Sequence, residues 1–163
     1  MRRRICVWVA CVGAVVVLMA APQQMAHAAP FGLVDDSELE CLALNIYFES
    51  RSEPRIGQVA VAYTTLNRVA DAKFPNTVCG VVLQGGEETR HRCQFSWWCD
   101  GRSDAVHERK AWLNSVRIAQ LAMQKRIGDP TDGALFYHHE RVNPKWSRAF
   151  ELTAKIGKHL FYR

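Results

Sequence analysis

Apolar residues recur every three or four positions along residues 37–52, 54–69 and 106–126. This spacing predicts three helices, each with one apolar face. A capping box at residues 37–40 is expected to open the first helix. Pro54 restricts the residue before it, so it ends the first helix near that point and serves as the first residue of the second.

The other apolar segments are short. Residues 134–138 are predicted as a strand, and residues 152–156 and 159–162 are expected to pair as a hairpin. Residues 71–104 are rich in glycine and cysteine, which predicts a long, disulfide-stapled loop segment. The pattern as a whole favours an α+β fold, mostly α, with a small β element.

The N-terminus has the composition of a secretion signal. Three arginines precede an apolar run from Ile5 to Ala21, and a small-residue site follows at Ala26-His27-Ala28. A retained membrane anchor is the alternative, but the run is shorter than the roughly 20 residues that span a bilayer. The expected organisation is a signal peptide at residues 1–28, a short tether at 29–36 and one domain at 37–163.

Removal of this leader changes the balance of charge. The leader carries three arginines and no acids, so the net charge falls from +5 to +2. The remaining cations are scattered singly among acids, unlike the basic stripe with interleaved aromatics that binds nucleic acid. We therefore expect no nucleic-acid partner and no membrane span after cleavage. The product should be a monomer, secreted or held in the periplasm or cell envelope.

Four cysteines remain after the leader: Cys41, Cys79, Cys93 and Cys99. An even number in an oxidising compartment predicts two disulfides, and three pairings are open. A zinc site with His91 or His107 is the alternative, but no C-x-x-C knuckle is present. We expect no metal and no cofactor.

One acidic residue falls inside an apolar stripe. Glu49 lies seven residues after Leu42 and three after Ile46, on the apolar face of the first predicted helix. Burial and the negative end of the helix dipole should both raise its pKa, as a general acid requires. The alternative is a structural acid paired with Arg51 or Arg68.

A second carboxylate at a fixed distance would indicate a conventional glycosidase. Glu53 is the neighbouring acid, but it precedes Pro54 and is expected on a solvated bend. Glu49 is therefore predicted to act without an obvious acidic partner.

Several polar residues fall in apolar settings, where each either satisfies buried hydrogen bonds or contacts a ligand. They are Gln58, Asn67, Gln94 and Ser96. His138 is expected to be a hydrogen-bonding wall residue beside Tyr137. A metal site at His138-His139 is disfavoured, because adjacent residues of a strand face opposite ways.

A set of motifs then occurs in a fixed order from about residue 38 to the C-terminus. The segments are Cys41–Pro54, Gly57–Ala62, Leu66–Val69, Phe74–Val82, Cys93–Ser96, Tyr137–His138 and Ile156–Tyr162. Together they resemble the catalytic domain of the SleB-type cell-wall hydrolases, also called spore-cortex-lytic enzymes. Glu49 matches the first glutamate of the family's Y-x-E-A-R-G-E pattern. Ser50 and Ser52 replace its alanine and glycine, and Ser52 would be strained if that position needs positive φ.

The resemblance implies a lysozyme-like fold that acts on peptidoglycan glycan strands as a lytic transglycosylase. One acid would protonate the oxygen between N-acetylmuramic acid and N-acetylglucosamine, then act as a base while the muramyl 6-hydroxyl closes a 1,6-anhydro ring. A hydrolytic muramidase and a non-catalytic wall-binding protein are the alternatives. A regulatory partner is expected, although no residue identifies it.

Aromatic residues could stack on the sugars of such a substrate through their apolar faces. The candidates are Phe95, Trp97, Trp98 and Trp146, with core packing as the alternative for each. Trp97 and Trp98 are adjacent, so at least one of them should be accessible. We take Trp97 as the binding candidate.

Overall fold

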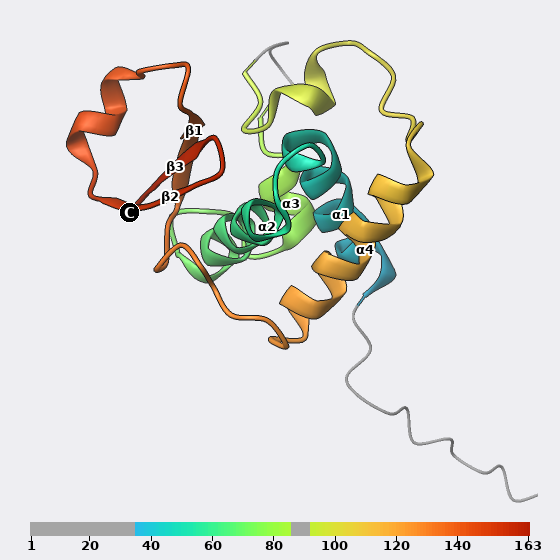
Figure 1. Ribbon diagram of the computed structural model, residues 1–163. Coiled ribbons are helices and arrows are strands. Elements are labelled where there is room, and N and C mark those ends of the chain that lie inside the picture. The colour runs from blue at the N-terminus through green and yellow to red at the C-terminus, as the bar shows by residue number, and fades with distance from the viewer. Residues whose placement is uncertain (1–34, 86–91) are drawn as a thin grey trace, which may run out of the picture. The chain divides into compact units, whose positions relative to one another are not determined.

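The computed structural model describes residues 35–85 and 92–163. The expected signal peptide, most of the tether and His91 lie outside these ranges. The elements in chain order are α1 (Asp36–Ser50), α2 (Arg55–Ala70), α3 (Val78–Val82), the 3-10 helix η1 (Ser96–Cys99), α4 (Arg109–Met123), β1 (Phe136–His139), the 3-10 helix η2 (Lys145–Ala149), β2 (Leu152–Ile156) and β3 (His159–Tyr162) (Figure 1). None of the helices in these ranges is long and apolar enough to cross a membrane.

Helix α1 is the centre of the helical part, and it contacts α2, α3 and α4 (Figure 1). Leu42 and Ile46 on its apolar face are fully buried, and Ile118 of α4 is buried in the same cluster. Burying a leucine or isoleucine side chain contributes about 1.5–3 kcal/mol. The three helices predicted from periodicity are therefore present, because their stripes meet in one core.

The start of α1 differs from the prediction. Its N-cap is Asp35, whose carboxylate accepts the N–H of Ser37 at 2.9 Å, so the expected capping box at 37–40 is wrong. Glu38, on the first turn, instead accepts the backbone N–H groups of Val78 and Cys79. These are first-turn donors of α3, which have no partner within a helix. Glu38 therefore caps a different helix from its own.

Helix α4 is three residues shorter at each end than the predicted 106–126. At its start, the Tyr47 hydroxyl accepts the N–H groups of His107 and Glu108, which holds this segment outside the helix. At its end, Lys125 adopts a φ of 54°, a left-handed conformation that closes helices. Ser52 is not among the described residues with positive φ, so the strain considered for it does not arise.

The predicted loop segment contains two short helices that periodicity did not reveal, α3 and η1. The expected pair of disulfides is present. Cys41–Cys79 joins α1 to α3, and Cys93–Cys99 closes a small ring that carries η1. The segment is therefore stapled, as its cysteines indicated.

The three strands form an antiparallel sheet in the order β1-β3-β2. The predicted hairpin is confirmed, since its two strands are β2 and β3. Phe161 of β3 is fully buried and packs with Ala60 of α2, so one face of the sheet lies on that helix. Tyr137 of β1 pairs with Phe161 in register and packs on the same cluster.

Glu53 fastens the sheet to the helices, and its expected place on a solvated bend is wrong. The side chain is buried, with 8% exposed, and its carboxylate accepts the N–H of Lys158 at 2.9 Å. Lys158 lies in the β2–β3 turn beside Gly157, which has a φ of 57°. A Cβ on Gly157 would collide with the Glu53 carboxylate. The glycine is needed both for its φ and for this close approach.

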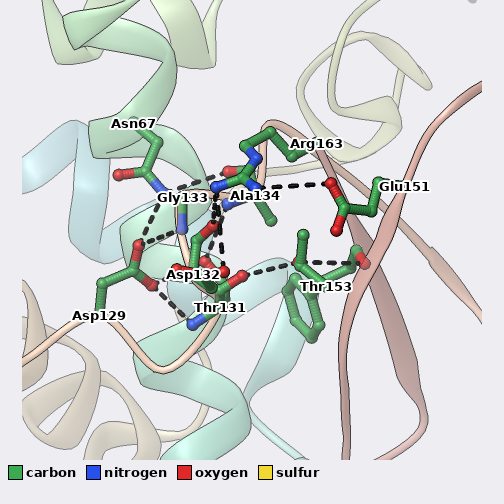
Figure 2. A network of polar contacts seen from close by, with 10 residues as sticks. Asn67, Asp129, Thr131, Asp132, Gly133, Ala134, Glu151, Thr153 and Arg163 are labelled. Carbon is green, nitrogen blue, oxygen red and sulfur yellow. Dashed lines mark hydrogen bonds and ion pairs between the residues drawn. The ribbon is translucent and has the colours of Figure 1, made fainter.

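A second polar joint connects α2, the loop after α4 and the sheet (Figure 2). Asp129 accepts hydrogen bonds from the N–H and hydroxyl of Thr131, the N–H of Gly133 and the amide of Asn67. Asn67 also donates to the carbonyl of Ala134 at 3.2 Å. This network fixes the chain just before β1, and so helps to position Tyr137.

Candidate active site

Glu49 lies in the last turn of α1, and its side chain reaches Tyr137 of β1. Its Oε2 atom accepts a hydrogen bond from the hydroxyl of Tyr137 at 2.9 Å. The two residues are 88 positions apart in the chain, and each element is held by the core and joints described above. The tertiary fold, and not nearness in the sequence, brings them together.

The surroundings of Glu49 favour its neutral form. Burial raises the pKa of Glu49, and the Tyr137 hydrogen bond and the positive charge of Arg68 offset part of that rise. The direction is the one expected from its place in the apolar stripe. Burial and the nearby Glu49 charge also raise the pKa of Tyr137 far above its ordinary value, so its hydroxyl stays a donor.

Arg68 is the residue of this site that sequence reasoning treated only as a structural partner. It is 2% exposed, and its Nε donates to the carbonyl of Leu135 at 2.6 Å. Its guanidinium lies 5.4–5.8 Å from the ring centroids of Phe74, Phe95 and Phe136, within the range of cation–π attraction. The sequence holds no signal for this role, because the rings around Arg68 come from segments that meet it only in the fold.

The ion pairs of the described residues do not support the structural alternative for Glu49. None of them joins Glu49 to Arg51 or to Arg68. Arg51 pairs with Glu108 at 2.9 Å, on the surface. The Glu49 carboxyl is thus left facing a cavity with Tyr137 as its partner.

A cavity of about 200 Å³ opens beside this carboxyl. Its lining residues are Glu49, Arg68, Cys93, Gln94, Phe95, Ser96 and Tyr137. In the amide orientation that satisfies both groups, the Gln94 oxygen accepts from the two terminal nitrogens of Arg68 at 3.1 and 3.2 Å. Gln94 and Ser96, predicted as candidates, therefore do lie beside Glu49, on the ring closed by Cys93–Cys99.

A second cavity, of about 530 Å³, shares Arg68, Gln94 and Tyr137 with the first. Its remaining lining residues are Phe136, His138, Val142, Pro144, Trp146 and Phe150. Nε2 of His138 lies 3.0 Å from the Tyr162 hydroxyl, and the two rings are stacked. His138 is thus a wall residue beside Tyr137 in this second cavity.

Three predicted site residues lie away from both cavities. Asn67 belongs to the Asp129 joint (Figure 2). Gln58 donates to the carbonyl of Glu53 at 3.0 Å and accepts from Asn114 at 2.7 Å. Trp97 stacks on Phe48 with ring centroids 4.6 Å apart, and its indole N–H donates to Asn45. In this structure the contacts of Asn67, Gln58 and Trp97 are with the protein itself.

Within residues 35–85 and 92–163, no three His, Cys, Asp or Glu side chains converge as a ligand set for a metal ion. The four cysteines considered for zinc are consumed by the disulfides. Of the residues described, Glu49 is the one carboxylate that lines either cavity. A single carboxyl in this position can donate or accept a proton.

Sequence comparison identifies the family. The sequence profile described as Cell Wall Hydrolase matches residues 52–162, more than half of the chain. The chain belongs to this cell wall hydrolase family. The matched segment begins just after Glu49, and it includes Arg68, Gln94 and Tyr137. The resemblance inferred from the ordered motifs is therefore confirmed.

Relatives of known structure support the fold as well as the family. A spore cortex-lytic enzyme of Bacillus cereus is 35% identical over 143 residues, which are 86% of this chain and 49% of that protein. The crystal structure of the catalytic domain of Bacillus cereus SleB matches with a TM-score of 0.60 and 34% identity, covering 82% of this chain and 94% of the domain. The catalytic domain of the germination-specific lytic transglycosylase SleB from Bacillus anthracis matches with a TM-score of 0.62 and 34% identity, covering 80% and 97%. The chain spans about half the length of these curated relatives, and nearly all of the two SleB catalytic domains of known structure.

Proposed function

We propose that this protein cleaves the glycan strands of peptidoglycan between N-acetylmuramic acid and N-acetylglucosamine, as a lytic transglycosylase, with Glu49 as acid and then base. The observation that carries the proposal is the Glu49 carboxyl, whose pKa burial raises, facing a cavity in a cell wall hydrolase fold. A relative with 34% identity over this domain is described as a germination-specific lytic transglycosylase.

In the first step, Glu49 gives its proton to the glycosidic oxygen as the bond from that oxygen to the muramyl C1 breaks. The leaving sugar departs as a neutral alcohol, and positive charge develops at C1. A partly buried carboxyl is suited to this step, because burial raises its pKa above the ordinary value of 4.5 and so favours the form that carries the proton.

In the second step, the carboxylate of Glu49 removes the proton of the muramyl 6-hydroxyl, whose oxygen bonds to C1 and closes the 1,6-anhydro ring. Glu49 is then neutral again, and no water is consumed. The Tyr137 hydroxyl and the Arg68 charge both stabilise the ionised carboxyl between the two steps. Burial therefore favours the protonated form of Glu49 that acts as the acid, and Tyr137 and Arg68 favour the ionised form that acts as the base.

The test is Glu49→Gln, assayed on purified peptidoglycan with product masses read by mass spectrometry. We expect anhydro-muropeptides from the wild type and none from the variant. The exposed Glu140, which pairs with Lys155, supplies the matched control Glu140→Gln, which should digest as the wild type does. Digestion by Glu49→Gln at the wild-type rate would refute the assignment, and reducing ends in place of anhydro ends would indicate a muramidase.

The Glu49→Gln protein should remain folded, since the Tyr137 hydroxyl can donate to the amide oxygen. Its stability should equal or exceed that of the wild type at neutral pH. The reason is linkage: a carboxyl with a raised pKa in the folded state destabilises the fold as the pH rises from its ordinary value of 4.5 through that raised pKa. Loss of activity can then be assigned to chemistry and not to unfolding.

We also propose that residues 1–28 are a signal peptide, that residues 29–36 are a tether, and that residues 37–163 act outside the cytoplasmic membrane as a monomer. The charge and apolar pattern of the N-terminus supports this arrangement. N-terminal sequencing of the exported protein should begin at Ala29. A product that still begins at Met1 in the membrane fraction would indicate an anchor.

A further inference from the structure

The larger cavity is lined by large apolar side chains that remain partly exposed, two of them aromatic. Trp146 is 36% exposed, Phe150 is 39% exposed and Val142 is 54% exposed. Large apolar side chains gathered at one cavity of a water-soluble domain commonly mark a ligand or interaction site. The smaller cavity contrasts with it, because polar groups dominate the surroundings of Glu49.

The aromatic rings are held in place by one another. The Phe136 and Phe150 centroids are 4.5 Å apart, and the Trp146 indole lies 5.9 Å from Phe136 and 5.5 Å from both His138 and Tyr162. The backbone before Trp146 is fixed as well, since both the N–H and the hydroxyl of Ser147 donate to the Pro144 carbonyl. A platform that is already ordered loses little entropy when a ligand binds.

The two cavities are continuous at Arg68, Gln94 and Tyr137, which line both. A polymer with its scissile bond at Glu49 therefore has its next unit within reach of the aromatic platform. The larger cavity, of about 530 Å³, falls within the range of 300–1,000 Å³ typical of ligand pockets. The smaller cavity, of about 200 Å³, lies below that range. The larger cavity therefore offers the room that a neighbouring unit of the strand needs.

We infer that Trp146 and Phe150 form a sugar-binding subsite, in which a pyranose ring of the glycan strand next to the scissile bond stacks its C–H face on the aromatic platform. This inference rests on the proposed function, because Glu49 sets where the scissile bond lies. A sugar ring fits better than the stem peptide, since its C–H face matches the aromatic faces of Trp146 and Phe150 and the polar side chains of Gln94 and His138 line the same cavity. Trp97, the candidate from sequence, is packed on Phe48 and lines neither cavity.

The test measures binding without turnover. Calorimetry with Glu49→Gln protein and glycan oligosaccharides freed of stem peptides gives the Kd of the parent. Adding Trp146→Ala or Phe150→Ala should raise Kd roughly tenfold, as removal of a stacking aromatic at the centre of a site does. Trp146→Phe should stay within about threefold, because it keeps an aromatic face. Leu113→Ala, on the exposed surface of α4, is the matched control and should bind as the parent does.

Unchanged affinity in both alanine variants, or no measurable binding by the parent, would overturn the inference. The titrations are repeated with strands that carry stem peptides, and a loss of affinity seen only with those strands would also overturn the inference, since that would place the peptide in the cavity. Thermal unfolding of each variant separates lost stacking from lost fold, and Phe150, as the more exposed of the two, is the safer substitution. Failure of the proposed function would be seen separately, as peptidoglycan digestion by the Glu49→Gln parent.

Discussion

Gly157→Ala tests the joint between the sheet and the helices with a single methyl group. Two costs add. An alanine at the φ of 57° found here pays about 1–2 kcal/mol for a left-handed conformation. Its Cβ also occupies the position of the Glu53 carboxylate, which must swing away from the Lys158 N–H. Leaving buried polar partners unsatisfied costs about 1–3 kcal/mol.

We therefore expect Gly157→Ala to lose about 3 kcal/mol of unfolding free energy. For a domain of this size that lowers Tm by on the order of 10 °C, and a domain with 5–15 kcal/mol of stability still folds. Differential scanning calorimetry or urea unfolding followed by circular dichroism measures the loss. Gly128→Ala is the control, because nothing lies within 4 Å of a Cβ at that position, and its Tm should stay close to that of the wild type.

A double-mutant cycle isolates the contact itself. In a Glu53→Ala background the methyl group meets no carboxylate, so Gly157→Ala should cost only the backbone part, about 1–2 kcal/mol. The difference between the two backgrounds is the Glu53 contribution. An equal cost in both backgrounds would contradict the collision, and a Tm within 2 °C of the wild type for the single variant would contradict both parts of the reasoning.

Three further predictions follow from contacts around the site. Tyr137→Phe removes the hydroxyl that stabilises ionised Glu49, so the pKa of Glu49 should rise further. The alkaline limb of the pH profile of kcat/KM should then move up by about one pH unit, since a hydrogen bond to a charged group is worth about 1.5 kcal/mol. An unmoved limb would show that this bond does not set the ionisation. Replacing Cys93 and Cys99 by serine should cost about 2 kcal/mol of stability and reduce activity by roughly tenfold or more, because the ring they close lines the Glu49 cavity. Breaking Cys41–Cys79, which lines neither cavity, should lower Tm but leave kcat of the folded protein unchanged. The donors around Asp129 share its two carboxylate oxygens, and Asp129→Asn leaves them only one acceptor oxygen. This variant should lose about 1–3 kcal/mol of unfolding free energy at neutral pH. Burial raises the pKa of Asp129, but its hydrogen bonds lower it more, so the pKa lies below its ordinary value of 3.8. The difference in Tm between the wild type and Asp129→Asn should therefore shrink as the pH falls below 3.8. A constant difference down to about pH 2 would be inconsistent with this role.

The position of Glu49 could be predicted because it depends on local geometry alone. A helix places residues 42, 46 and 49 on one face, and an acid on that face must be buried or line a cavity. Its partners could not be found in this way. Tyr137 and Arg68 reach it through the packing of β1 on α2, and no periodicity within either element specifies that contact.

Local reasoning failed where a side chain serves a distant element. The capping box predicted at residues 37–40 does not form, and Glu38 inside it caps α3 instead. Glu53 was expected on a solvated bend but binds the β2–β3 turn. Both are carboxylates that accept backbone N–H groups about 40 and 105 residues away. The tryptophans show the same limit, since burial depends on what packs above each ring. Trp97 is covered by its stacking on Phe48, whereas Trp146 remains open.

The ring closed by Cys93 and Cys99 has a consequence for when the site is complete. The wall residues Gln94 and Ser96 lie within that ring, which forms only when both thiols are oxidised. In a reducing cytoplasm the two thiols stay apart and this wall is untethered. If the protein is exported as we propose, its synthesis is thereby separated from its full activity. The last step in assembling the site would then take place only after the chain has reached the compartment that holds its proposed substrate.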